Sequence, residues 1–229
     1  MNTAAGAPVP AYLEKNYWWA YVRPSAVRFW DRPWLINLIL FGKYRTLRDK
    51  VLHEFGHAIS GKTLQISCCY GELTPRLFEC VKKGRGTLDV VDVLPVQLEN
   101  LKRKLPKDSS VQTFPMDAAL LDFPDALYEQ VLVFFLLHEV PQEYREKIMR
   151  EALRVLKPGG KIIIADYGAP SCFHPLRYLL LPLLGRLEPT ARELWNRELN
   201  RILPNEMRAH TWRKTSYFGG LYQMLVSTG

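Results

Sequence analysis

Hydrophobic positions along the middle of the chain alternate between two spacings. Short segments with the apolar pattern of strands occur at 63–68, 87–92, 111–114, 131–137 and 161–165. Between them, apolar side chains recur every three or four positions, the spacing of a helix face, at 72–83, 95–105 and 142–156. The run 131–137 is apolar throughout, which is typical of a central parallel strand buried on both faces. This alternation predicts an α/β fold with a doubly wound, mostly parallel sheet.

The segment before this core is rich in aromatic residues and is divided by prolines. Residues 1–10 predict a loose leader, and residues 12–41 hold many Trp, Tyr and Phe side chains. Pro24 and Pro33 predict the starts of two short helices, because proline fits the first turn of a helix but not its interior. Residues 34–41 are apolar on nearly every face. They therefore either pack on the main domain or contact lipid or an apolar substrate, and the two alternatives are compatible.

Further elements are predicted on either side of the core. An amphipathic helix is expected at 46–59, and β-rich runs around Gly219-Gly220 predict a hairpin that closes the sheet. Residues 171–210 leave the alternating pattern and predict a helical insertion that forms a lid. The predicted division is an aromatic-rich helical segment at 1–50 and an α/β domain at 51–229.

The net charge of +8 narrows the choice of partners. Basic residues flank the apolar and aromatic segments, an arrangement that suits peripheral contact with an anionic membrane surface better than a groove for nucleic acid. Solvated helix faces are the alternative explanation. The chain has four cysteines without a disulfide or zinc spacing, which predicts packed thiols in a reducing compartment. No apolar run is long enough to predict a spanning helix.

Two strand ends predict a nucleotide site. The stretch 63–74 reads as a strand, a tight turn at Tyr70-Gly71 and a helix, the opening of a nucleotide-binding βαβ unit whose helix N-terminus faces the ligand. Asp92 ends the next strand, where a carboxylate can accept hydrogen bonds from both hydroxyls of a ribose.

Two further strand ends carry acid–base groups. His138 and Glu139 follow the apolar run 131–137, and Asp166 follows 161–165. The carboxyl ends of parallel strands share one edge of a sheet, so these groups are expected to converge, and imidazole with carboxylates suits a divalent ion such as manganese. The alternative is that His138-Glu139 caps a helix and contacts a partner without metal.

These stretches resemble class I S-adenosylmethionine-dependent methyltransferases. The first motif of that family has an acidic residue and then glycines at three alternating positions, which correspond here to Gln65, Ser67, Cys69 and Gly71, so that only the last glycine is kept. The resemblance implies a Rossmann-like fold and S-adenosylmethionine as cofactor. It places the cofactor against Gln65, Ser67, Cys69, Tyr70, Gly71, Asp92, Val93, Met116, Asp117 and Ala118.

A narrower resemblance covers nearly the whole chain. The motifs Tyr17-Trp18-Trp19-Ala20-Tyr21, Cys68-Cys69-Tyr70-Gly71, Phe134-Phe135-Leu136-Leu137-His138-Glu139 and Tyr217-Phe218-Gly219-Gly220 resemble the RquA family of bacterial rhodoquinone-biosynthesis proteins. That family replaces a methoxy group of ubiquinone by an amino group. The resemblance implies S-adenosylmethionine as amino donor, manganese (Mn²⁺) dependence, ubiquinone and rhodoquinone as ligands, and peripheral attachment to the cytoplasmic side of the inner membrane.

Residue roles follow as hypotheses. Tyr70, His138 and Asp166 are the expected catalytic residues, and His138, Glu139 and Asp166 the expected metal ligands. An amide at Gln65, where relatives carry a carboxylate, should lower the pKa of the cofactor's amine and favour its neutral, nucleophilic form. The alternatives are a conventional methyltransferase acting on a quinone or lipid, and a non-catalytic quinone-binding protein. Loss of residues 1–42 is expected to abolish membrane association and spare cofactor binding.

Overall fold

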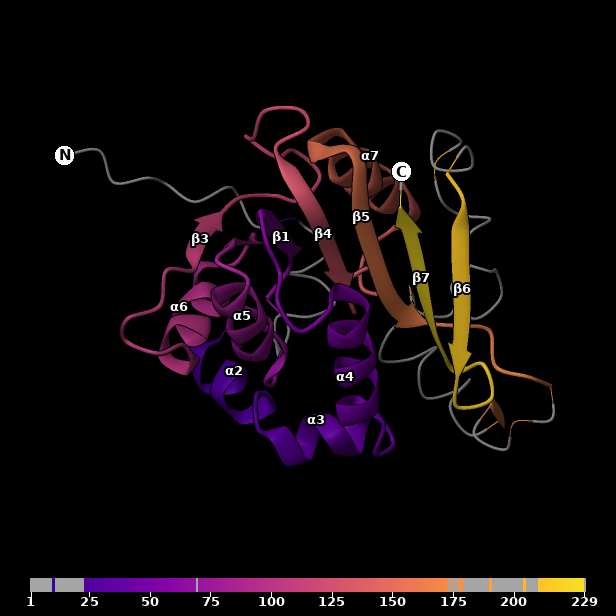
Figure 1. Ribbon diagram of the computed structural model, residues 1–229. Helices are drawn as coiled ribbons and strands as arrows, with labels where there is room; N and C mark the ends of the chain where they lie inside the picture. The colour runs from indigo at the N-terminus through magenta and orange to yellow at the C-terminus, as the bar shows by residue number, and fades with distance from the viewer. Residues whose placement is uncertain are drawn as a thin grey trace. The chain divides into compact units, whose positions relative to one another are not determined.

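The computed structural model describes residues 10, 23–68, 70–172, 174, 177–178, 190, 204 and 210–228. Seven strands follow the order β3-β2-β1-β4-β5-β7-β6 in one sheet (Figure 1). The predicted fold class, a mostly parallel Rossmann-like sheet with helices, is confirmed. The chain divides into two compact units, residues 1–122 and 123–229. The expected boundary at residue 50 falls within a helix of the first unit.

The first unit holds three parallel strands, β1 (Lys62–Ile66), β2 (Thr87–Asp92) and β3 (Gln112–Pro115), with β2 paired to both neighbours. Helix α5 (Leu73–Lys83) follows β1, and helix α6 (Pro95–Lys104) follows β2. Helix α5 buries one face through residues three or four apart, which are Leu73, Leu77, Phe78 and Val81. Strand, helix and strand therefore form where the hydrophobic pattern predicted them.

Among the residues that the structure describes, three helices precede these strands in the first unit: α2 (Pro24–Trp30), α3 (Pro33–Ile39) and α4 (Tyr44–Phe55) (Figure 1). Each predicted proline stands in the first turn of its helix. Helix α4 ends four residues earlier than predicted, because Gly56 takes a left-handed backbone with φ of 93°. No helix among the described residues is both long and apolar enough to cross a membrane.

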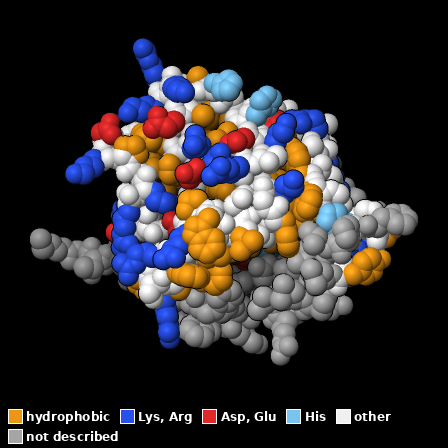
Figure 2. Space-filling model, turned by 90° about the horizontal axis from the view of Figure 1, so that it is seen from below, with side chains coloured by type: hydrophobic (Ala, Val, Ile, Leu, Met, Phe, Trp, Pro, Cys, Tyr) orange, Lys and Arg blue, Asp and Glu red, His pale blue; other side chains and the backbone are white. Residues whose placement is uncertain are grey.

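Helix α3 packs on the first unit through one face, as one expectation for its apolar sequence had it, whereas contact of its other face with lipid or an apolar substrate stays a prediction. Leu35 and Ile36 are buried, whereas Trp34, Leu38 and Ile39 are 60%, 65% and 42% exposed. Figure 2, which views the molecule from the side where α3 lies in Figure 1, shows hydrophobic side chains among many Lys and Arg side chains. This helix therefore anchors in the core through one face and presents an apolar face outward.

The second unit holds β4 (Tyr128–Phe134), helix α7 (Gln142–Val155), β5 (Leu156–Tyr167), β6 (Trp212–Tyr217) and β7 (Tyr222–Thr228). Strands β4 and β5 are parallel, and β7 runs antiparallel to both β5 and β6. The β6–β7 turn passes through Gly219 and Gly220 at positive φ, which confirms the predicted hairpin.

Two boundaries in this unit differ from the prediction. Strand β4 begins three residues before the apolar run and ends at Phe134, because Phe135 adopts a left-handed backbone with φ of 51°. Strand β5 begins at Leu156, which pairs with Tyr128 before a bulge, so the strand starts five residues before the predicted segment at 161–165. The segments 1–9 and 11–22 and most of the expected lid at 171–210 lie outside the described residues.

Candidate functional site

The loop after β1 contains two residues with a left-handed backbone. Ser67 has a φ of 74° and Gly71 a φ of 86°, both in the left-handed region. The buried Gln65 side chain donates from Nε2 to the carbonyl of Ser67 at 2.9 Å. A carboxylate at this position could not donate that hydrogen bond. The amide therefore supports a loop in which serine occupies the position of a family glycine.

Asp92 ties the end of β2 to this loop. Its Oδ2 accepts from the backbone N–H of Cys68 at 2.8 Å, and its Oδ1 accepts from that of Leu94 at 2.9 Å. Burial raises the pKa of Asp92 to about 6, although hydrogen bonds from Leu94, Cys68 and the Ser67 side chain act in the opposite direction. Two predicted cofactor residues, Ser67 and Asp92, therefore lie together. The predicted contact at Cys69 lies outside the described residues.

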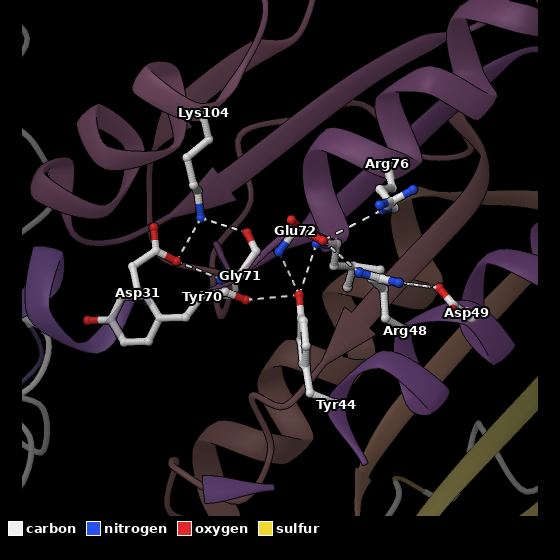
Figure 3. Close-up of polar contacts among 10 residues, drawn as sticks. Asp31, Tyr44, Arg48, Asp49, Tyr70, Gly71, Glu72, Arg76 and Lys104 are labelled. Carbon is white, nitrogen blue, oxygen red and sulfur yellow. Dashed lines mark hydrogen bonds and ion pairs between the residues drawn. The ribbon is translucent and has the colours of Figure 1, made fainter. Parts of the chain in front are cut away.

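Side chains from outside the loop form hydrogen bonds with the backbone of Gly71 (Figure 3). Asp31, the residue that caps the C-terminus of α2, accepts from the Gly71 N–H through Oδ1 at 2.6 Å. Lys104 at the end of α6 donates to the Gly71 carbonyl at 2.9 Å and to Asp31 Oδ1 at 3.0 Å. Asn100 donates to Asp31 Oδ2 at 2.7 Å. Both polar groups of this one glycine are therefore fixed by helices α2 and α6.

Tyr44 caps the N-terminus of α5 from a different helix. The Glu72 N–H donates to the phenol oxygen of Tyr44 at 2.7 Å and the Leu73 N–H at 3.1 Å, while the phenol donates to the Tyr70 carbonyl at 3.4 Å (Figure 3). Glu72 makes no side-chain capping bond of its own. A Cβ on Gly71 would overlap the Tyr44 hydroxyl, so glycine is required here for space as well as for backbone conformation.

The other predicted cofactor residues are spread along the same unit. The Tyr70 hydroxyl accepts from Gln97 Nε2 at 3.1 Å, which fixes its ring toward α6. Asp117 uses its carboxylate locally and accepts from the Ala119 N–H at 2.8 Å. Val93 follows β2, and Met116 and Ala118 flank Asp117 after β3; all are half-buried. Their contacts with a cofactor stay predictions.

In the second unit, His138 and Asp166 form a buried pair. The distance between His138 Nδ1 and Asp166 Oδ1 is 2.9 Å, and Asp166 is fully buried at the end of β5. Asp166 Oδ1 also accepts from the Tyr167 N–H, and Oδ2 accepts from the N–H groups of Leu137 and His138. Because the carboxylate only accepts, His138 Nδ1 carries the proton and Nε2 is the basic nitrogen. The predicted convergence of these two residues is confirmed.

The expected manganese ligands do not fit a metal in this arrangement. The Asp166 carboxylate accepts from four donors, which match its four lone pairs. It therefore has no lone pair left to bind a metal ion. Glu139 Oε1 lies 3.7 Å from His138 Nε2. The described residues contain no group of three His, Cys, Asp or Glu side chains placed to hold a metal ion. Manganese binding stays a prediction that this geometry does not support.

An aromatic cluster surrounds the His138 ring. Tyr167 meets it edge-on with ring centroids 4.8 Å apart, and Phe135 does so at 5.8 Å. Tyr222 stacks on Tyr167 at 5.7 Å. Phe135 can reach this group because its left-handed backbone turns the chain sharply at the end of β4. Buried His174 packs against Phe218 of the hairpin at 5.1 Å, which places this candidate lid residue beside the same strands.

Buried Arg145 on α7 fixes the turn that carries His138. Its Nε donates to the Leu137 carbonyl at 2.6 Å, and its Nη2 donates to the Thr190 carbonyl at 2.8 Å. The Thr190 hydroxyl in turn donates to the His138 carbonyl at 2.6 Å. The backbone on both sides of the Leu137–His138 peptide is therefore held by side chains from later in the chain.

Sequence reasoning did not find these supporting residues. Asp31, Tyr44 and Lys104 come from helices whose pattern indicates only burial and charge, and no local motif links them to the loop at 70–72. Arg145 lay on a helix predicted for its apolar face alone. The one available signal was the loss of two family glycines, which implies that something else must hold the loop.

Known proteins match this arrangement. Residues 64–164 match a family described as a methyltransferase domain. The fold superposes on a SAM-dependent methyltransferase from Aquifex aeolicus with a TM-score of 0.61 and 20% identity, over 90% of this chain and 97% of that one. Residues 64–164 are therefore similar to methyltransferase domains, and the fold is that of S-adenosylmethionine-dependent methyltransferases. The N-methyltransferase NodS from Bradyrhizobium japonicum, solved with S-adenosyl-L-homocysteine, shares the fold with a TM-score of 0.57 and 15% identity, over 82% of this chain and 87% of that one.

The chain is also similar in sequence to quinone-pathway enzymes. The demethylmenaquinone methyltransferase of Staphylococcus saprophyticus is 29% identical over 159 residues, which cover 67% of each chain. The ubiquinone/menaquinone biosynthesis C-methyltransferase UbiE of Pseudomonas paraeruginosa is 28% identical over 205 residues, covering 85% of this chain and 75% of that one. These similarities support S-adenosylmethionine as the cofactor, and its contacts with the loop after β1 and with Asp92 stay predictions.

Proposed function

We propose that the protein uses S-adenosylmethionine to modify the ring of an isoprenoid quinone. Its relatives in the quinone pathways support the substrate class. The observation that carries the proposal is the His138–Asp166 pair set among aromatic rings in a methyltransferase domain. A quinone or quinol ring is planar and apolar and stacks against aromatic side chains, while its oxygens exchange protons with a neighbouring imidazole.

The chain's own residues would act as an acid–base system. Asp166 holds the His138 tautomer with Nε2 basic, and Arg145 and Thr190 hold the backbone that presents the ring. His138 Nε2 would take a proton from the substrate as the new bond forms, and the buried carboxylate would stabilise the imidazolium. When bound, S-adenosylmethionine would supply either its sulfonium methyl group to a ring carbon, which leaves S-adenosylhomocysteine, or its amino nitrogen, which replaces a ring methoxy group that leaves as methanol. In the second case the donor's own carbon–nitrogen bond must also break, with the quinone ring accepting its two electrons and water releasing the donor carbon as a keto acid.

Two transfers are therefore candidates. Methyl transfer is the activity named for the relatives. Amino transfer, as in the RquA family, is favoured by Gln65, because a buried neutral amide replaces the carboxylate that stabilises the charged amine in ordinary methyltransferases. The amide also supports the glycine-poor loop through its bond to Ser67.

Mass analysis of the product separates the two transfers. The purified protein is incubated with S-adenosylmethionine and either ubiquinone or a demethylated quinol in detergent, with and without Mn²⁺. Replacement of methoxy by amino lowers the mass of the quinone, whereas methylation raises it. His138→Gln should abolish either product, while the exposed His53→Gln should not. Absence of turnover with every quinone would refute the proposed substrate class.

The role of Gln65 in amino transfer has its own test. In Gln65→Glu, a carboxylate near the cofactor's ammonium group should raise that amine's pKa, and so shift the rise of amino transfer to higher pH. Thermal melting with S-adenosylhomocysteine checks that the variant still folds and binds. A folded variant that keeps the wild-type rate of amino transfer at neutral pH would contradict the role.

We further propose that the protein reaches its apolar substrate from an anionic membrane surface, on the cytoplasmic side of the inner membrane. The docking face consists of the exposed apolar side chains of α2 and α3, which are Phe29, Trp34, Leu38 and Ile39. Exposed basic residues adjoin it at Arg28, Arg32 and Arg45. Aromatic and aliphatic groups enter the interface while arginines meet lipid phosphates, which is how interfacial helices bind. Sedimentation with phosphatidylglycerol vesicles tests this, with Trp34→Ala/Leu38→Ala as the variant expected to stay in solution.

A further inference from the structure

We propose that Asp31 couples membrane docking to cofactor binding, so that a lipid surface raises the affinity of the protein for its cofactor. The inference rests on the membrane docking proposed above, and Asp31 acts in it as a positioning residue. It joins two features that are far apart in sequence: the docking face on α2 and α3, and the loop at 70–72 that follows β1.

The loop at 70–72 depends on the N-terminal helices. Asp31 accepts from the Gly71 N–H at 2.6 Å, Lys104 bonds both Asp31 and the Gly71 carbonyl, and Tyr44 bonds the backbone of residues 70, 72 and 73 (Figure 3). Arg48 adds an ion pair with Glu72 at 2.8 Å. Side chains at the end of α2 and on α4 therefore hold the backbone of this loop.

Asp31 belongs to the chain segment that carries the docking face. It lies in the short link between α2 and α3, two residues after Phe29 and three before Trp34. Its own side chain is only 8% exposed and points inward to the loop, whereas those two aromatic rings are 45% and 60% exposed. One short segment thus faces outward through its apolar side chains and inward through its carboxylate.

The segment that carries the docking face has little stability of its own. Helices α2 and α3 are each seven residues long, too short to be stable by themselves in water. Only Val27 of α2 and two residues of α3 are buried. A lipid surface that orders these helices therefore also fixes Asp31, and with it the Gly71 N–H. By linkage, any cofactor that binds the ordered loop must strengthen membrane docking by the same factor.

The test measures docking and cofactor affinity separately, without quinone. Titration calorimetry gives the Kd for S-adenosylhomocysteine with no vesicles, with phosphatidylglycerol–phosphatidylethanolamine vesicles and with phosphatidylcholine vesicles. For the wild type we expect anionic vesicles to lower the Kd about 5- to 10-fold, within the usual range of coupling. Asp31→Ala should still sediment with vesicles but show equal Kd values in all conditions. Asp31→Asn, which keeps an acceptor for Gly71, should restore part of the effect.

Matched variants separate this coupling from charge and from docking. Asp108→Ala removes one negative charge from an exposed side chain and should behave as wild type. Trp34→Ala/Leu38→Ala should keep the vesicle-free Kd and lose the response. Wild-type protein that docks without a change in Kd, or Asp31→Ala that keeps the full response, would overturn the coupling. Failure to sediment, or dimerisation through α3, would instead overturn the docking, and neither result depends on the identity of the substrate.

Discussion

Tyr44 offers the sharpest test of how the cofactor loop is built. Its phenol oxygen accepts from two backbone N–H groups at the start of α5, and Leu73 N is buried. Tyr44→Phe removes the oxygen and leaves the ring, which is 2% exposed, in its packing. The change therefore isolates the hydrogen bonds from the hydrophobic contacts.

The magnitude follows from the groups left behind. Loss of a helix cap costs about 0.5–2 kcal/mol, and a buried donor without an acceptor costs about 1–3 kcal/mol. Glu72 N is only partly buried and can recover water, so the two donors together should cost about 2 kcal/mol. For a chain of this size that lowers Tm by about 4–8 °C. The affinity for S-adenosylhomocysteine should fall as well, because the same N–H groups begin the helix that faces the cofactor.

Tyr222→Phe is the matched control, measured by scanning calorimetry and cofactor titration. The Tyr222 hydroxyl is fully buried and, in the part of the chain that the structure describes, has no hydrogen-bond partner. Burial also raises the pKa of this hydroxyl. Its removal should leave stability unchanged or increase it. Equal Tm values for the two variants, or wild-type cofactor affinity in Tyr44→Phe, would refute the capping role.

Four further predictions concern the loop after β1 and the strand ends. Gly71→Ala should abolish S-adenosylhomocysteine binding in a filter assay, because a Cβ there overlaps the Tyr44 hydroxyl. The control is Gly159→Ala, at φ of 75° with open space around it, which should lose only about 1–2 kcal/mol of stability and keep binding. With the Asp92 pKa at about 6, cofactor affinity should fall as pH drops below 6, approaching about tenfold per pH unit, and Asp92→Asn should remove this dependence in calorimetry. Because the pKa of Asp92 is raised from 3.8 to about 6, protonated Asp92 stabilises the folded state below pH 3.8, and this stabilisation is lost as pH rises to about 6. Thermal melting at several acidic pH values can check this. Asp166→Asn should lower turnover about 10²- to 10⁴-fold with cofactor Kd unchanged, since it disturbs the His138 tautomer; unchanged turnover would exclude His138 as the base.

Much of the fold could be predicted from the sequence because it depends on local periodicity. The strand at 87–92 and the helix after Gly71 follow their hydrophobic patterns almost to the residue. Strand β4 was displaced because Glu129 and Gln130, half-buried at its start, carry no apolar signal. Its end was set by the left-handed Phe135, a conformation that the residue type does not indicate.

The candidate site was predictable only where it depends on strand ends. His138 and Asp166 meet because parallel strands β4 and β5 end at one edge, a rule of the fold. Asp31 and Gly71 are forty positions apart in the sequence, and the sequence pattern alone cannot predict a hydrogen bond between them. The metal prediction used the same strand ends but could not foresee that backbone N–H groups would occupy the Asp166 oxygens.

The buried guanidinium of Arg145 has a consequence for building hybrids of this enzyme with its relatives. It bridges the carbonyls of Leu137 and Thr190, and a lysine, with a single nitrogen on a flexible stem, could not span both. A donor segment that replaces the region around Thr190 must therefore bring a carbonyl to the same point. Otherwise the buried Arg145 guanidinium lacks an acceptor next to His138. The hybrid would then misplace the His138 imidazole even when the residues that contact the substrate are correct.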